Sequence, residues 1–221
     1  FNSWKSSVRA GTGLIGGKFA MDVRLSRVLS DGFIDRASSN LKSFYLSGSY
    51  VGKKSLIKAV AFSGKERTYQ SWYGTPESVI NGDANEMNAY ADRNYLSDAE
   101  RTNLLESGRS YNYYTYKDEV DNYQQDNYQL HFTHTFSPKT TLNIAGHYTK
   151  GRGYYEQYKF GENLSEYGLS DVIVGADTVT STDLIRRRWL DNDFVGGVYS
   201  LSHTVNSNLS LQLGGAGNTY I

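Results

Sequence analysis

Two polar stretches of the sequence, about residues 65–122 and about residues 150–185, are rich in tyrosine, and the first also contains Trp72. Aromatic rings offer a large ligand flat, stiff, amphipathic surfaces that lose little conformational entropy on binding. We therefore predict that both stretches are long loops that contact a ligand through Trp72, Tyr73, Tyr113, Tyr114, Tyr116, Tyr154 and Tyr155. The alternative is that these rings pack on one another or form an aromatic belt at a membrane surface.

Other residue types offer little catalytic or metal-binding chemistry. The chain has no cysteine, which excludes thiolate metal sites and disulfides. His131 and His134 lie three residues apart on an expected strand, so they point to opposite faces and cannot share a metal ion. The acidic residues Asp118, Glu119 and Asp121 lack the spacing of an EF-hand loop. Because no Ser–His–Asp or Cys–His arrangement is suggested, we predict no enzyme, no metal site and no cofactor.

Two basic features each allow two interpretations. His147 is expected on a polar strand face near the long loops, where it either meets a ligand or is simply solvated. Residues 186–188 are three consecutive arginines. They either steer an anionic ligand or lipopolysaccharide phosphates, or mark the place where a strand leaves a membrane for water.

Composition limits the class of protein. The chain has 221 residues, 19 Tyr, 22 Gly, 2 Pro and a formal net charge of zero, with a mean hydropathy of −0.56. A neutral balance argues against a nucleic-acid partner, which would normally require a basic excess. No run of about 18 apolar residues is present, so a transmembrane helix is excluded. A transmembrane barrel remains open because each of its strands needs only about ten alternating residues.

The clearest local pattern lies at residues 19–26, which alternate between large apolar and small or charged side chains, the period of a β-strand. Residues 4–14 repeat the alternation, and a turn at residues 15–18 would make the two apolar faces coincide, which fixes the register of a hairpin. The expected pairs are Val8 with Leu25, Ala10 with Val23, Thr12 with Met21 and Leu14 with Phe19. The charged residues Arg9, Asp22 and Arg24 fall on the opposite face.

Further alternating segments give about eight strands, near residues 4–14, 19–26, 43–50, 55–66, 128–136, 142–148, 193–203 and 209–213. Alternation is weak in the fourth, where counting from the turn places Ile57, Ala59 and Ala61 on the apolar face. The connections alternate strictly between short turns and longer loops, so all short turns must lie at one end of the sheet. Outer-membrane barrels segregate their loops in this way. We predict an all-β, antiparallel transmembrane β-barrel wall with long extracellular loops, in a bacterial outer membrane.

Two short helices are expected inside the first aromatic stretch. Residues 75–77 place Thr75 as an N-cap before a proline at the first helical position. Residues 97–100 form a capping box, and Gly108 is placed to end that helix.

Five runs, in this order along the chain, resemble TonB-dependent outer-membrane receptors of the Bacteroidetes type: residues 30–40, 64–72, 121–125, 147–156 and 183–188. The resemblance implies a barrel of about 22 strands with a plug in its lumen. Residues 1–221 would then be a consecutive part of the barrel domain, without the plug, the TonB box or the remaining strands.

The resemblance also implies a function and partners. These receptors import scarce nutrients such as iron–siderophores, haem or cobalamin, and the TonB complex supplies the energy through the plug. The implied partners are outer-membrane lipid, the TonB complex, a small-molecule metal chelate or cofactor ligand, and a surface lipoprotein over the loops. The alternative is a small eight-stranded outer-membrane barrel that acts as an adhesin or a structural surface protein.

Overall fold

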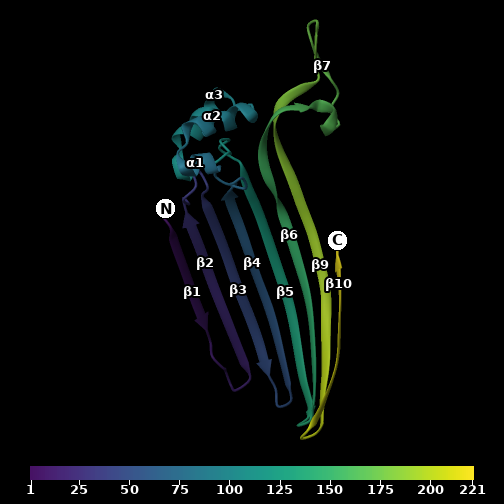
Figure 1. The fold of residues 1–221 in the computed structure, drawn as a ribbon. Coiled ribbons are helices and arrows are strands. Elements are labelled where there is room, and N and C mark those ends of the chain that lie inside the picture. The colour runs from purple at the N-terminus through teal and green to yellow at the C-terminus, as the bar shows by residue number, and fades with distance from the viewer.

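The segments whose side chains alternate in polarity form one eight-stranded antiparallel sheet in the computed structural model, which describes residues 1–221. Figure 1 shows the strands side by side as a long wall. In order across the wall they are β1 (Trp4–Gly11), β2 (Phe19–Ser30), β3 (Ser39–Val51), β4 (Ser55–Tyr69), β5 (Val120–Ser137), β6 (Thr140–Asn163), β9 (Ser181–Asn206) and β10 (Leu209–Tyr220). The all-β, antiparallel prediction and the number of strands are confirmed. The two edge strands, β1 and β10, each pair on one side only, so these eight strands form an open sheet and not a closed barrel.

The first hairpin has the expected register along its strands. Val8 lies opposite Leu25, and Ala10 lies opposite Val23. At the tip the prediction is wrong by one residue, since Ile15 and not Leu14 bridges to Phe19. The reason is the tight turn, in which Gly16 and Gly17 both adopt positive φ, at +56° and +68°.

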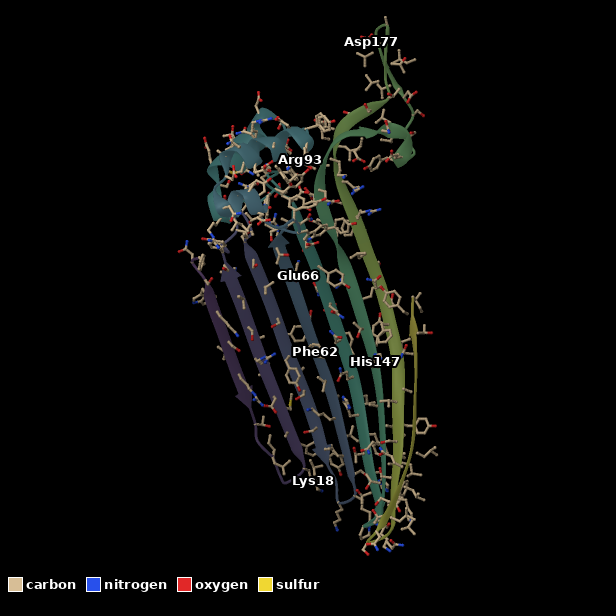
Figure 2. All side chains as sticks on the ribbon, viewed as in Figure 1. Lys18, Phe62, Glu66, Arg93, His147 and Asp177 are labelled. Carbon is tan, nitrogen blue, oxygen red and sulfur yellow. The ribbon has the colours of Figure 1, made fainter.

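The two faces of the wall differ in chemistry. One face, called the apolar face below, carries rows of cross-strand partners such as Phe19, Tyr50, Ile57, Phe132, Ile144 and Tyr199. Of these, Phe19, Ile57, Ile144 and Tyr199 are exposed, and Tyr50 and Phe132 are half-buried. Figure 2 draws the side chains along the wall. The other face, called the polar face, carries residues such as Ser49, Lys58 and His131, which are cross-strand partners. The fourth strand has the expected register, because Ile57 lies opposite Tyr50 and therefore shares its apolar face.

All short connections lie at one end of the wall. Residues 12–18, 52–54, 138–139 and 207–208 turn the chain at the lower end in Figure 1. The longer connections, residues 31–38, 70–119 and 164–180, lie at the opposite end, which we call the loop end. The segregation expected from the sequence is confirmed.

The connection between β4 and β5 folds into a helical segment at the loop end. It contains α1 (Glu77–Asn81), α2 (Ala84–Arg93), α3 (Asp98–Glu106) and the 3₁₀ turn η1 (Gly108–Ser110). They enclose a small core of Val79, Met87, Ala91, Leu104 and Tyr111. None of these helices is long and apolar enough to span a membrane.

The helix predictions are partly confirmed. The capping box is present, since the Ser97 side chain accepts from the Glu100 N–H while the Glu100 carboxylate accepts from the Ser97 N–H. The first cap is wrong because Pro76, not Thr75, occupies the N-cap position and makes no side-chain cap bond. The sequence prediction also missed α2, whose N-cap Asp83 accepts from two backbone N–H groups.

The second predicted loop is largely strand. β6 continues to Asn163 and β9 already begins at Ser181, so only residues 164–180 connect them. This connection holds the 3₁₀ turn η2 (Leu164–Tyr167) and a hairpin of β7 (Val172–Val174) and β8 (Asp177–Val179). Tyr154 and Tyr155 therefore lie on a strand rather than on a loop. They pair with Asn122 and Asp121 of β5 on one side and with Trp189 and Arg188 of β9 on the other.

Candidate functional site

Five of the seven predicted ligand-contact residues meet at the loop end. Trp72 packs edge-on against Tyr114, with ring centroids 6.3 Å apart, and against Tyr155 at 5.5 Å. Tyr73 lies 4.8 Å from Tyr113 and 5.6 Å from Tyr114. We call Trp72, Tyr73, Tyr113, Tyr114 and Tyr155 the aromatic cluster. It joins residues that are more than 80 positions apart, Trp72 and Tyr155, through the fold alone.

The residues of the aromatic cluster differ in how much of each side chain is exposed to solvent. Trp72 and Tyr73 are 56% and 61% exposed, whereas Tyr114 is 8% exposed. Tyr114 packs against Tyr69 and Val120 at the ends of β4 and β5. Its burial raises the pKa of the Tyr114 hydroxyl, which therefore stays protonated. The Trp72 and Tyr73 rings therefore face solvent, and the buried Tyr114 supports them.

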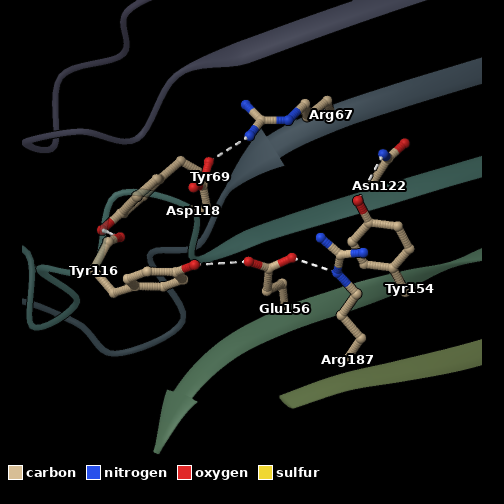
Figure 3. Close-up of polar contacts among 8 residues, drawn as sticks. All are labelled: Arg67, Tyr69, Tyr116, Asp118, Asn122, Tyr154, Glu156 and Arg187. Carbon is tan, nitrogen blue, oxygen red and sulfur yellow. Dashed lines mark hydrogen bonds and ion pairs between the residues drawn. The ribbon is translucent and has the colours of Figure 1, made fainter. Parts of the chain in front are cut away.

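The remaining two predicted residues, Tyr116 and Tyr154, lie outside the cluster. Figure 3 draws both with their polar contacts. Tyr154 and Tyr155 are consecutive strand residues and so point to opposite faces. The Tyr154 ring packs against Trp189 at 4.8 Å and receives the Arg187 guanidinium 4.7 Å from its centroid. Tyr116 instead donates its hydroxyl hydrogen bond to Glu156 Oε1 at 2.8 Å.

Glu156 joins the helical segment to the extended strands. Its carboxylate accepts from Tyr116 and, at 2.6 Å, from Arg187 Nε on β9. Gln70 Nε2 donates to the backbone carbonyl of Glu156 at 3.1 Å. The Glu156 side chain is 5% exposed, so both oxygens need these partners. We call Tyr116, Glu156 and Arg187 the latch.

Arg36 and Asn112 fix the backbone beneath the cluster. Arg36 donates to the carbonyls of Tyr114 at 2.9 Å and Asn112 at 3.1 Å. Asn112 is buried, and its amide donates to the carbonyls of Asp35 and Gln70 at 2.9 and 3.0 Å. These bonds tie the loop after β2 and the chain after β4 to the segment that carries Tyr113.

A pocket of about 290 Å³ opens beside the cluster. Tyr73, Tyr113, Tyr114 and Tyr116 line it together with three carboxylates and one ammonium group, from Glu100, Glu119, Glu162 and Lys159. Glu119 is buried, which raises the pKa of its carboxyl. The pocket presents aromatic surface, hydroxyl groups and a mostly acidic wall.

Comparison with known proteins supports the fold. No protein-family model and no curated protein matches the chain. Among solved structures, it is similar to the ferric-catecholate import receptor Fiu from E. coli K12 in its open form, with a TM-score of 0.60 over 99% of this chain. The sequences are 14% identical, and the match covers 33% of the receptor, so the chain spans about one third of that receptor's length. The two share a fold.

The residues that sequence reasoning missed are those that organise the site. Glu156, Arg187, Arg36, Asn112 and Gln70 carry the polar contacts. All but Asn112 lie in the runs that resemble a known family, but nothing in those runs marks these residues as contact partners. Their partners lie 31 to 86 positions away along the chain. Arg36 also has a φ of +65°, which is uncommon for a residue other than glycine, but this feature is visible only in the structure.

The latch is expected to weaken in acid. Burial alone would raise the pKa of Glu156, but hydrogen bonds from Arg187 and Tyr116 more than offset this effect and hold the pKa below its ordinary value. The stabilisation is therefore complete above the ordinary glutamate pKa and is lost as the pH falls through the lower pKa of the folded state. Hydrogen exchange of residues 111–119 should rise below about pH 4. Glu156→Gln should remove this pH dependence, and an equally steep rise in that variant would contradict the assignment.

Proposed function

We propose that residues 1–221 form part of the wall and outer loops of a TonB-dependent import receptor in a bacterial outer membrane. The observation that carries the proposal is the combination of an exposed apolar face with loops segregated to one end. A face of exposed large apolar side chains needs a covering of similar polarity. Hydrocarbon provides it, and barrels in outer membranes have short turns on one side and long loops on the other.

The height of the apolar face fits this placement. On β5 it runs from Tyr128 to Phe136, and Leu130 between them is 57% exposed. A tilted strand needs about 9–11 residues to cross the hydrocarbon. Tyr128 stacks on Tyr148 with centroids 6.2 Å apart, at the level where an aromatic belt would meet the membrane surface.

The ligand would bind at the loop end, on the exposed rings of the aromatic cluster and in the adjoining pocket. We propose that it is a metal chelate or cofactor of the iron–siderophore, haem or cobalamin class. Three carboxylates and one ammonium group in the pocket wall favour the neutral or cationic members of this class over its anionic members. The likeness to a ferric-catecholate import receptor supports the transport class without fixing this ligand.

The complete receptor would have about 22 strands around a plug, as the resemblance of its sequence runs to the Bacteroidetes type implies. The TonB complex would act through that plug. A surface lipoprotein over the loops would be a further partner.

Uptake by the full-length protein tests the proposed function. Cells that produce it should accumulate one class from a panel of ferric siderophores, haem and cobalamin, and accumulation should cease when TonB is deleted. Binding that continues without TonB separates recognition from energy coupling. If the protein assembles in the outer membrane but no member of the panel is bound or accumulated, the transport proposal is wrong and the adhesive or structural alternative is favoured.

A further inference from the structure

Three basic residues form a row across the apolar face. The row lies on the loop-end side of the large apolar side chains of that face. Arg27 on β2 lies directly opposite Lys42 on β3, which lies directly opposite Lys65 on β4. All three side chains are exposed. We call Arg27, Lys42 and Lys65 the basic row. On the next strands the same row continues with Gln124, Arg152 and Asp191.

The basic row lacks acidic partners. None of its three residues forms an ion pair, although carboxylates lie farther along the same face. Those carboxylates are already engaged: Asp126 pairs with Arg152, and Asp191 and Asp193 both pair with Lys150. Like charges directly opposite each other on one face of a sheet are destabilising. Three adjacent cations in one row therefore indicate an anion that is supplied from outside the chain.

A groove lies below the basic row on β3 and β4 and extends across β5 and β6. It has a volume of about 460 Å³ and is lined by Leu46, Gly48, Ala59, Ala61, Leu130 and Gly146. The two glycines leave it open, since nothing lies within 4 Å of a Cβ built at Gly48, and a Cβ built at Gly146 would make only an ordinary contact with the Gly196 carbonyl oxygen at 3.8 Å. Leu46 is four residues along β3 from Lys42, a separation of roughly 13 Å. Figure 2 labels Glu66, Phe62 and His147, which are the sequence neighbours of Lys65, Ala61 and Gly146 and so mark the heights of the row and the groove along the wall.

From this arrangement we infer that the wall binds one anionic lipid, with its phosphate-bearing headgroup on the basic row and an acyl chain in the groove. Arginine and lysine are the side chains that bind phosphate most strongly. An occupant must be charged at one end and apolar about 13 Å away, which a lipid satisfies and a free phosphate does not. The inference rests on the proposed function, because that function places the apolar face against hydrocarbon.

Lipid retention by the detergent-solubilised full-length protein tests the inference. Native mass spectrometry would compare phosphatidylglycerol with phosphatidylcholine, and inorganic phosphate would serve as the headgroup-only probe. The wild type should retain phosphatidylglycerol selectively and should not retain inorganic phosphate. The triple variant Arg27→Gln, Lys42→Gln, Lys65→Gln should bind phosphatidylglycerol at least about tenfold more weakly than the wild type, since each cation near an anionic headgroup contributes to binding.

Two further variants sharpen the test. Arg24→Gln with Lys58→Gln removes cations from the polar face and should leave lipid retention unchanged. Gly48→Leu with Gly146→Leu fills the groove and should weaken retention of both lipids while preserving the preference for phosphatidylglycerol. Circular dichroism would verify the sheet content of every variant. Equal retention by the triple variant and the wild type would overturn the headgroup site, and unchanged retention after the groove is filled would overturn the acyl site.

The outcome is separable from that of the proposed function. A receptor that imports a ligand but shows no preference for phosphatidylglycerol would refute the lipid site alone. A protein that selects the lipid but imports nothing would refute transport alone.

Discussion

Met21→Arg is expected to reduce sharply the amount of full-length protein assembled in the outer membrane, whereas Ala20→Arg is expected to have little effect. Met21 lies on the apolar face, opposite Gly48 and in the same row as Leu130, so it lies between the levels of Tyr128 and Phe136, and it is 53% exposed. An arginine that faces lipid at the midplane of a barrel costs about 2–4 kcal/mol, a factor of about 30 to 1,000 in an equilibrium constant. Ala20 is the adjacent residue but points to the polar face, opposite Ser49.

The pair forms a matched comparison because the two substitutions add the same side chain at neighbouring positions of one strand. Resistance of the folded barrel to dissociation in detergent, together with its abundance in outer-membrane fractions, measures assembly. Equal loss in both variants would mean that the two faces are equivalent. In that case the apolar face does not contact hydrocarbon, and the membrane placement would have to be abandoned.

The strands of the wall and their register could be predicted where one face is polar and the other apolar, because the side chains then alternate in polarity along each strand. In β2 the alternation of Met21, Val23 and Leu25 with charged residues is a strong local signal, and it sets both the strand and its register with β1. The weaker pattern of β4 could still be placed from the turn that precedes it, because side chains alternate strictly along a strand.

The same principle explains why the extensions of β6 and β9 were missed. Beyond Arg152, successive residues of β6 such as Tyr154, Tyr155 and Gln157 are aromatic or polar on both faces. When both faces meet polar surroundings, no alternation remains to mark a strand. These extensions are stabilised by pairing with each other, a long-range interaction that a local pattern does not report.

The candidate site was predicted by residue type but not by geometry. The abundance of aromatic residues directed attention to Trp72, Tyr73 and Tyr113, and the fold brings these three together around Tyr114. Residue type could not distinguish an exposed ring from a supporting one, since Tyr114 and Tyr113 are neighbours in sequence but differ in burial, at 8% and 37% exposed. That difference depends on the contact of Tyr114 with Tyr69 and Val120, which only the tertiary structure establishes.

Replacing Trp72 and Tyr73 together by alanine is expected to lower ligand affinity by about 30-fold or more, the effect of losing an aromatic hot spot of about 2 kcal/mol. Both rings are exposed at the loop end, and Tyr73 lines the pocket. Neither is a main support of the helical segment, whose core lies at Val79, Met87 and Leu104. The measurement is isothermal titration of the full-length protein with whichever ligand of the uptake panel the wild type binds.

Tyr95→Ala is the matched control, because Tyr95 is an aromatic residue of the same segment, 93% exposed and outside the cluster. Its loss should leave the affinity unchanged. Tyr114→Ala would be a poor test, since it removes a buried support and is expected to disturb the packing of Tyr69 and Val120. If the Trp72 and Tyr73 variant binds as tightly as the wild type, the rings serve only to pack on one another. The ligand would then have to contact a part of the receptor other than the aromatic cluster.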